Sequence, residues 1–373
     1  SWGMMGNDNI TAYQYLSMYS FNTDSYYAFG KTPVSVQSIY ETVTANPLVT
    51  WETAKTWNIG FSSQFLNGKL GLDLDYFQSN RNDILITRNA SIPTYSGLLL
   101  PAENLGKVKN HGFEAIATYR DSKGDFEWGV TGNVTYAKNE VVYADEAADT
   151  PAWQRETGHP IDGGTYYKAL GIYQTQEQIE STPHLSGTKI GDLIYQDTNK
   201  DGNITWDDAV RRDKSATPKW IFGLTLNGSW KGMDVNAFFQ GQADAEILVQ
   251  PTMNMATDFY EGRWSESNTA EQNAAAKWPR AFMKASSVDN RNSQSSTWWL
   301  RDASFVRLKS LEIGYTFPKT LISPLGVEKL RLYVNGNNLF TIDSVGIFDP
   351  EMTNGIRGYS LQRSWTFGLN VTF

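Results

Sequence analysis

The chain has 373 residues, a formal net charge of −8 and no cysteine. These values exclude a disulfide framework, an iron–sulfur site and a thiol nucleophile, and the acidic balance argues against a nucleic-acid partner, which would require a basic stripe. No apolar run reaches the roughly 18 residues that a membrane-spanning helix requires, so any membrane span must consist of strands. The mean hydropathy of −0.44 does not separate a soluble protein from a β-barrel, because only alternate residues of a barrel strand face lipid.

Residues 1–49 are rich in Tyr, Asn, Ser and Thr and show no helical periodicity. We expect the end of a strand at Ser1–Met5, followed by a loop that is extracellular if the chain forms an outer-membrane barrel. From residue 50 to residue 373, the sequence predicts β-barrel strands joined by short turns and long outer loops.

Four pairs of alternating stretches are each joined by a short turn. In the first pair, apolar residues alternate from Trp57 to Phe61, and Asn67-Gly68 leads into a second alternating stretch, Leu70–Tyr76. Asn-Gly between two such stretches is the strongest short-range hairpin signal in a sequence. The other predicted turns are Ser122–Gly124, Lys231-Gly232 and about 319–328. With the last strand, the chain has about nine strands, each long enough to cross a bilayer at a tilt.

One strand changes parity along its length. Phe305, Val306 and Leu308 are followed by Leu311, which predicts a β-bulge at Lys309-Ser310. Arg307 and Lys309 would then face the lumen or the outer rim, and we expect them to be solvated charges at the rim.

The last ten residues, Ser364–Phe373, alternate strictly between apolar and small or polar side chains. A soluble β-sandwich would show the same alternation. Outer-membrane barrels, however, commonly end on a terminal aromatic residue, as this chain does at Phe373.

The connections alternate strictly between short and long. The long ones lie at about 82–108, 142–218, 243–304 and 341–360. A transmembrane barrel has this asymmetry, with tight periplasmic turns and long outer loops, whereas a sandwich has no reason to sort its loops by end. The predicted fold class is therefore all-β, a transmembrane antiparallel β-barrel with long extracellular loops.

Several short motifs occur in order over nearly the whole chain. They are Trp2-Gly3 with Gly6-Asn7, Asn46-Pro47 with Trp51-Glu52, Trp57–Gly60, Asp73–Phe77, Asp197–Asp208, Pro218–Gly223 with Phe238–Gly241, Arg263-Trp264, Pro279-Arg280, and Trp299–Gly314 with Leu330–Phe340. In these motifs the chain resembles the SusC/RagA-type TonB-dependent outer-membrane transporters of Bacteroidetes-like bacteria.

The resemblance implies the C-terminal strands of a large, plugged barrel of about 22 strands, a multi-pass protein of the cell outer membrane. The plug domain would be absent from this chain. The implied partners are therefore the N-terminal plug and barrel portion of the same protein, a SusD-like surface lipoprotein, the TonB complex and the lipid bilayer.

The function that the resemblance implies is glycan uptake, the import of an oligosaccharide together with a SusD-like lipoprotein. A peptide substrate is the alternative within the same class. Two rivals from other classes are a passive porin, which energy-dependent uptake would exclude, and a secreted glycan-binding β module, which partition into detergent would exclude.

Residues Asp197–Asp208 fit the calcium-loop template D-x-[DN]-x-[DN]-G. The predicted metal ligands are Asp197, Asn199, Asp201, the main-chain carbonyl of Asn203, Thr205 and Asp208. Aspartate replaces the usual bidentate glutamate at the last position, so we expect weak or moderate affinity for Ca²⁺, with Mg²⁺ as an alternative. The cation would have a structural role. A turn that binds nothing is the competing interpretation, since no flanking helices are evident.

Tryptophans in the long loops are candidate substrate-binding residues, because aromatic faces stack on sugar rings and apolar side chains. The candidates are Trp153, Trp206, Trp264, Trp298 and Trp299. Membrane-interface anchoring and loop packing are the competing roles. We expect the pair Trp298-Trp299, just before a strand, to mark the outer interface of the membrane.

No motif predicts an enzyme. His111, His159 and His184 are scattered, without an H-E-x-x-H pair. Neither a G-x-S-x-G nucleophile elbow nor a phosphate-binding Gly-Lys-Ser/Thr loop is present in the sequence.

Overall fold

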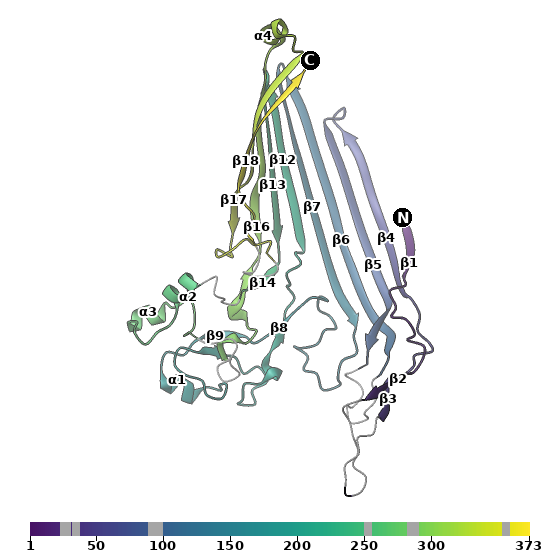
Figure 1. The fold of residues 1–373 in the computed structure, drawn as a ribbon, viewed down its shortest axis with the longest axis vertical. Helices are drawn as coiled ribbons and strands as arrows, with labels where there is room; N and C mark the ends of the chain where they lie inside the picture. The colour runs from purple at the N-terminus through teal and green to yellow at the C-terminus, as the bar shows by residue number, and fades with distance from the viewer. Residues whose placement is uncertain (23–30, 32–37, 89–99, 250–255, 282–290, 353–358) are drawn as a thin grey trace. The chain divides into compact units, whose positions relative to one another are not determined.

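The computed structural model describes residues 1–22, 31, 38–88, 100–249, 256–281, 291–352 and 359–373 (Figure 1). Its contacts divide the chain into two compact units. Unit 1 comprises Ser1–Ile59, Phe77–His111 and Lys138–Ile161, and unit 2 comprises Gly60–Tyr76, Gly112–Ala137 and Asp162–Phe373. None of the helices in the described part of the chain has the length and hydrophobicity that crossing a membrane would require.

Ten strands form one sheet in the order β1-β4-β5-β6-β7-β12-β13-β16-β17-β18. Their bounds are β1 Trp2–Asn7, β4 Glu52–Phe65, β5 Leu70–Thr87, β6 Ala102–Lys123, β7 Phe126–Tyr143, β12 Trp220–Trp230, β13 Met233–Ala243, β16 Phe305–Thr316, β17 Lys329–Asp343 and β18 Ser364–Thr372. Each strand therefore lies beside the sheet strand that precedes it along the chain. The predicted set of about nine strands and one strand end corresponds to these ten.

Eight further short strands lie between the long ones and pair two by two. They are β2 Met18–Asn22 with β3 Ser38–Val43, β8 Thr165–Tyr166 with β11 Val210–Arg211, β9 Ala169–Ile172 with β10 Leu193–Tyr195, and β14 Glu246–Leu248 with β15 Leu300–Asp302. The helices are α1 Gln176–Ser181, α2 Ala256–Gly262, α3 Ala270–Ala274 and α4 Lys319–Ile322, with 3₁₀ turns η2 Trp206–Asp208, η4 Arg291–Ser293, η5 Thr297–Trp299 and η6 Ser323–Leu325.

The predicted short turns are confirmed. Asn67 and Gly68, between β4 and β5, have φ values of 53° and 84°, and Lys231 and Gly232, between β12 and β13, have values of 48° and 89°. At Lys231-Gly232 the two consecutive positive φ angles belong to the turn type whose twist matches a two-residue hairpin. The link between β4 and β5 is longer: it comprises residues 66–69, and Leu66 also has a positive φ, of 54°. Gly232 also has no room for a Cβ, which would lie 2.6 Å from the carbonyl oxygen of Thr316.

The predicted bulge is confirmed as well. The pairing of β16 with β17 shifts register between Leu308 and Ser310, and the pairing of β13 with β16 shifts between Phe238 and Phe239. The extra residue is Lys309, which explains why the apolar positions of β16 change parity.

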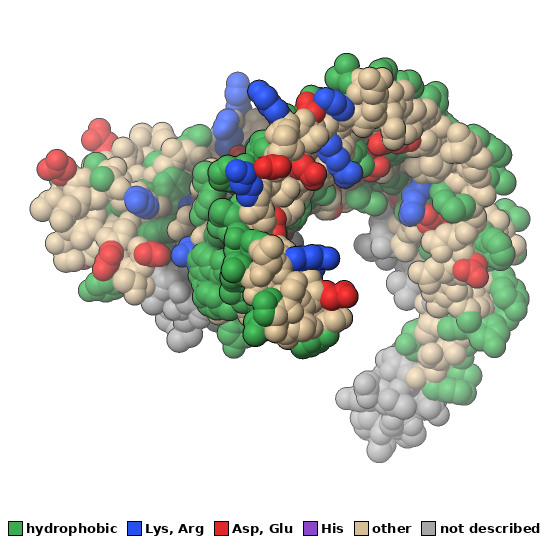
Figure 2. Space-filling view, turned by 90° about the horizontal axis from the view of Figure 1, so that it is seen from above, with side chains coloured by type: hydrophobic (Ala, Val, Ile, Leu, Met, Phe, Trp, Pro, Cys, Tyr) green, Lys and Arg blue, Asp and Glu red, His purple; other side chains and the backbone are tan. Residues whose placement is uncertain are grey.

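The sheet of unit 2 has one apolar and one polar face. Val235 pairs with Ile313, Ile313 with Val334, and Val334 with Phe367, so these four apolar side chains form one row across four strands. Phe367 is 82% exposed. Figure 2 shows hydrophobic side chains along one side of the strands and charged ones along the other. A face this apolar and this exposed is what lipid covers in a barrel.

The neighbouring row across the same strands is polar. Asn236 pairs with Glu312, Glu312 with Asn335, and Asn335 with Thr366. Because side chains of successive strand residues point to opposite faces, this row lies on the side away from the apolar one. It is the face that lines the lumen in a barrel of this kind.

The two ends of the unit 2 strands differ. Figure 1 shows α4 and the C-terminus at one end, and β8, β9, β14 and α1 toward the other. At the first end Lys329 pairs with Thr372, which brings the terminal residues beside the short link that follows β16. The long links meet at the opposite end, and that is where the candidate site lies.

Candidate functional site

The long links of unit 2 pack around a hydrophobic core of their own. Among the described residues, thirteen buried ones form it: Tyr167, Ile172, Leu193, Tyr195, Ile204, Ala245, Ile247, Val249, Trp264, Trp278, Trp299, Ala303 and Val345. We call the described parts of these links, 162–219, 244–249, 256–281, 291–304 and 344–352, the loop assembly. The rings of Trp278 and Trp299 stack in its centre, with centroids 5.7 Å apart and planes inclined by 13°. The sequence pattern does not indicate this core, because the links lack a regular period.

A buried carboxylate joins two of the links. Asp192 has no exposed surface, its Oδ1 accepts a hydrogen bond of 2.8 Å from the Asn292 amide, and Arg280 Nε lies 2.6 Å from the same oxygen. The Asn292 side-chain oxygen in turn accepts from the Leu193 main-chain N–H at 2.9 Å. Since these residues are about 90 to 100 positions apart, the contacts join the segment around Asp192 to the segments around Arg280 and Asn292 within unit 2.

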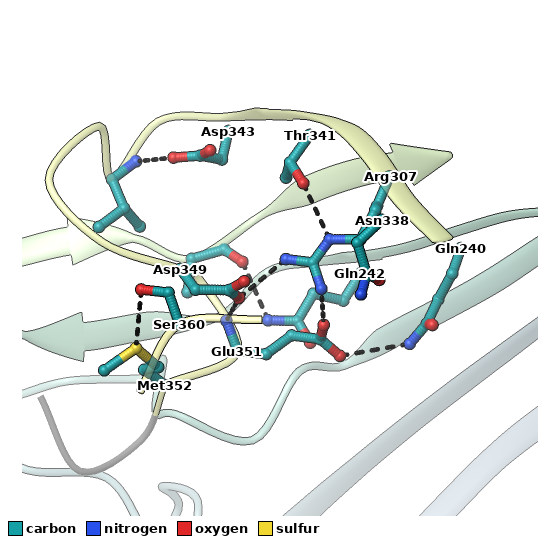
Figure 3. A network of polar contacts seen from close by, with 12 residues as sticks. Gln240, Gln242, Arg307, Asn338, Thr341, Asp343, Asp349, Glu351, Met352 and Ser360 are labelled. Carbon is teal, nitrogen blue, oxygen red and sulfur yellow. Dashed lines mark hydrogen bonds and ion pairs between the residues drawn. The ribbon is translucent and has the colours of Figure 1, made fainter. Parts of the chain in front are cut away.

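A second buried charge joins the sheet to the 344–363 link. Arg307 of β16 is 1% exposed; its guanidinium pairs with Asp349 at 2.8 Å and with Glu351, and its Nε donates to Thr341 Oγ1 at 2.8 Å. Figure 3 shows the guanidinium between these groups, with Gln240 of β13 donating to Glu351. The prediction of a solvated rim charge at Arg307 is therefore wrong. The guanidinium is buried and pairs with two carboxylates that lie more than 40 positions away in the sequence.

The polar face of the sheet carries a third ionic cluster nearer the short-turn end. Arg331 of β17 donates from Nε to Asp234 Oδ1 at 2.9 Å and from Nη2 to Glu312 Oε1 at 2.7 Å. Together with Glu127 and Asn227 these residues line a cavity of about 430 Å³. The polar face therefore offers charged and amide groups to whatever occupies the lumen.

A larger cavity of about 1040 Å³ lies in the loop assembly. We call it the loop cavity. Four segments line it: the region of α2, the region of α3, the start of β15 with the turn before it, and the 344–352 segment. The lining residues are Asp258, Glu261, Gly262, Arg263, Asn268, Gln272, Ala275, Ala276, Lys277, Trp278, Thr297, Trp298, Arg301, Val345, Gly346 and Ile347. All of these residues belong to unit 2.

The predicted cation loop has the hydrogen bonds of a series of Asx turns. Asp197 accepts from the N–H groups of Lys200 at 2.6 Å and Gly202 at 2.9 Å, and Asp201 accepts from Asn203 at 2.7 Å. The Asn203 N–H lowers the pKa of Asp201 below its ordinary value. Gly202 has the positive φ of 84° that the sharp turn requires.

Both oxygens of the last carboxylate of the loop accept hydrogen bonds from main-chain N–H groups. Asp208 is fully buried, Oδ1 accepts from the Thr198 N–H at 2.7 Å, and Oδ2 accepts from the Thr205 N–H at 2.8 Å. Among the described residues, no group of three His, Cys, Asp or Glu side chains forms a ready metal cluster. The residues thus fit a cation only through mixed amide, carbonyl and carboxylate oxygens, which is the donor set that Ca²⁺ accepts.

The five candidate tryptophans occupy different environments. Trp299 is fully buried and Trp264 is 8% exposed, so both rings pack inside the loop core. The prediction that Trp298-Trp299 marks the membrane interface is wrong for Trp299, whose Nε1 donates to the Asn292 carbonyl oxygen at 2.9 Å. Trp298 lines the loop cavity, Trp206 is 54% exposed, and Trp153 lies half-buried in unit 1. A ligand can therefore reach Trp298 and Trp206 more easily than the two core rings.

Comparison with known proteins places the chain among outer-membrane receptors. The family model described as TonB dependent receptor-like, beta-barrel, matches residues 10–339. TonB-dependent receptor P3 of Formosa agariphila is 29% identical over all of this chain, which covers 39% of that protein, and TonB-dependent receptor SusC of Bacteroides thetaiotaomicron is 26% identical over all of this chain, which covers 37% of that protein.

A solved structure of the same fold is the RagAB peptide importer in its open-open state. It matches with a TM-score of 0.69 and 21% sequence identity, over 100% of this chain and 39% of that chain. The chain thus spans about two fifths of the length of the relatives it matches.

Proposed function

Because this chain belongs to the TonB dependent receptor-like β-barrel family of the outer membrane, we propose that it is the C-terminal barrel part of an energy-driven importer of oligosaccharides. The observation that carries the proposal is the division of the unit 2 sheet into an apolar row and a polar row. The apolar row can contact lipid, and the polar row can line a hydrated path for a substrate. The loop assembly at the long-link end then supplies the surface that a substrate meets first.

An oligosaccharide suits the groups that line these surfaces. The polar face presents carboxylates, amides and an arginine, and the loop cavity adds aromatic rings, the combination that orients a hydroxyl-rich ligand. A peptide is the second candidate, because the solved structure of the same fold is titled a peptide importer. Deletion of the gene tests the proposal: growth on one class of glycan as sole carbon source should be lost, and growth on peptides should be retained. The reverse outcome would favour the peptide.

We also propose that the chain works with an N-terminal plug and barrel portion, the TonB complex and a SusD-like surface lipoprotein. Bare edges on β1 and β18 support the first of these, because each of these strands pairs on one side only within the described sheet. Mass spectrometry of the detergent-solubilised complex should identify a plug-bearing polypeptide and a lipoprotein. Recovery of this chain alone, in buffer without detergent, would favour a secreted glycan-binding module instead.

A structural divalent cation in the 197–208 loop is a further part of the proposal. Addition of Ca²⁺ should protect this loop from proteolysis, and the substitution Asp201→Ala should abolish the protection, since it removes one of the few charged ligands. Asp213→Ala, outside the loop, is the matched control and should leave the protection unchanged. Equal proteolysis of the native protein with Ca²⁺ and with a chelator would contradict the cation site.

A further inference from the structure

The loop cavity contains a half-buried cation without an acidic partner. Arg301 of β15 lines the cavity, and its Nη1 donates to the main-chain oxygens of Trp298 and Leu300, each at 2.8 Å. Burial lowers the pKa of Arg301, and no nearby carboxylate opposes that shift in the described part of the chain. An arginine nevertheless stays protonated in a protein. Among the described residues, no carboxylate pairs with this charge. The guanidinium carbon lies 5.4 Å from the ring centroid of Trp278, and the Nε and Nη2 donors have no hydrogen-bond acceptor in the described part of the chain.

An aromatic surface lies beside this cation. Trp298 packs against the loop core and lines the same cavity. Its indole N–H has no acceptor among the described residues. A ligand with a flat apolar face could pack against the ring, and its oxygen atoms could accept hydrogen bonds from the unused donors of Arg301. A sugar ring with an acidic substituent has both features.

Three of the other charged side chains that line the cavity are solvated. Asp258, Glu261 and Lys277 line it but are exposed, so water and salt screen them. Arg263 lies over the ring of Tyr260, with 3.9 Å between the guanidinium carbon and the ring centroid. Arg263 and Arg301 are both half-buried. Because charge interactions strengthen as water is excluded, these two cations favour a negatively charged ligand in the cavity.

We propose that the loop cavity binds an acidic sugar residue, with Arg301 pairing with its carboxylate or sulfate group and Trp298 contacting its ring. The inference rests on the proposed import function and narrows its substrate class to acidic oligosaccharides. The cavity volume of about 1040 Å³ lies at the upper end of small-molecule sites and accommodates several sugar units.

Calorimetric titration of the full-length protein in detergent tests the inference. The probes are tetragalacturonate, which carries carboxylates, a sulfated carrageenan tetrasaccharide, and neutral maltotetraose. One acidic probe should bind at least about tenfold more tightly than the neutral one, and its affinity should fall as salt is raised. Which acidic probe binds more tightly distinguishes a carboxylate ligand from a sulfate ligand.

The substitution Arg301→Gln should weaken binding of the acidic probe by about 10- to 100-fold and leave binding of the neutral probe unchanged. Arg81→Gln, an exposed arginine of unit 1 paired with Glu52, is the matched control and should bind like the native protein. Because Arg301 also contacts two main-chain oxygens, Arg301→Lys provides a milder second variant, and the unfolding midpoint of each variant is recorded.

Equal affinity for acidic and neutral probes, tighter binding of an acidic peptide, or native affinity in Arg301→Gln would overturn the inference. So would the absence of binding by all three oligosaccharides. Energy-dependent uptake of neutral glycans alone would leave the import function standing and remove the acidic-sugar site. Binding of an acidic probe without energy-dependent uptake would support the acidic-sugar site and contradict the import function.

Discussion

The substitution Arg307→Met is expected to release the 344–363 link and to destabilise the folded protein by about 3–5 kcal/mol. Arg307 is 1% exposed and compensates two carboxylates, Asp349 and Glu351, which would then repel each other in a site largely shielded from water. Limited proteolysis of the full-length protein in detergent should show new cleavage within residues 344–352, and thermal unfolding should begin at a lower temperature.

Two further variants separate the ion pair from a general loss of stability. Arg331→Met removes another arginine that pairs with two carboxylates, but its partners Asp234 and Glu312 lie on the sheet, so residues 344–352 should stay resistant to protease. Combining Arg307→Met with Asp349→Leu and Glu351→Met should recover much of the lost stability, since no buried charge is left unpaired. Unchanged proteolysis of Arg307→Met would contradict the role assigned to this pair.

The second large effect is expected on the apolar face of β12. Leu226 lies on the apolar face, two residues before Gly228, which pairs with Val235 of the apolar row. Leu226→Arg places a charge on this face and should cost about 2–4 kcal/mol. Asn227→Arg, one residue further on the opposite face, should assemble almost normally. The measurement is the amount of folded protein recovered from the outer membrane for each variant.

The comparison of neighbouring residues makes this result decisive. Both variants carry the same new side chain on the same strand, and both native residues are exposed in the described structure. They differ only in the face of the sheet on which they lie. Equal recovery of the two variants would mean that lipid does not cover the face of β12 that carries Leu226.

The hairpins and the bulge of the sheet could be predicted from the sequence because their signals are local. Alternation with a period of two and an Asn-Gly or Lys-Gly pair mark the turns at Asn67-Gly68 and Lys231-Gly232, and a change of parity marks Lys309. Strand ends were less predictable. β6 begins at Ala102, before its apolar alternation starts, so the link from β5 is shorter than the predicted 82–108.

The loop assembly could not be predicted, because its contacts join residues far apart in the chain. Asn292 contacts Asp192, and Asp349 contacts Arg307. In the sequence, nothing distinguishes Asn292, Asp192 or Asp349 from the other polar residues of the links. The tryptophans show the same limit. Composition identified them as unusual, but only packing separates the buried Trp299 from Trp298, which lines the cavity.

Uptake of a labelled oligosaccharide by intact cells tests the central claim most directly. The account predicts accumulation that requires this gene and that stops when a protonophore collapses the inner-membrane proton gradient. The label should remain at the cell surface in the treated cells, bound but not imported. Uptake that continues at the same rate without the gradient would contradict an energy-driven importer and identify a passive porin.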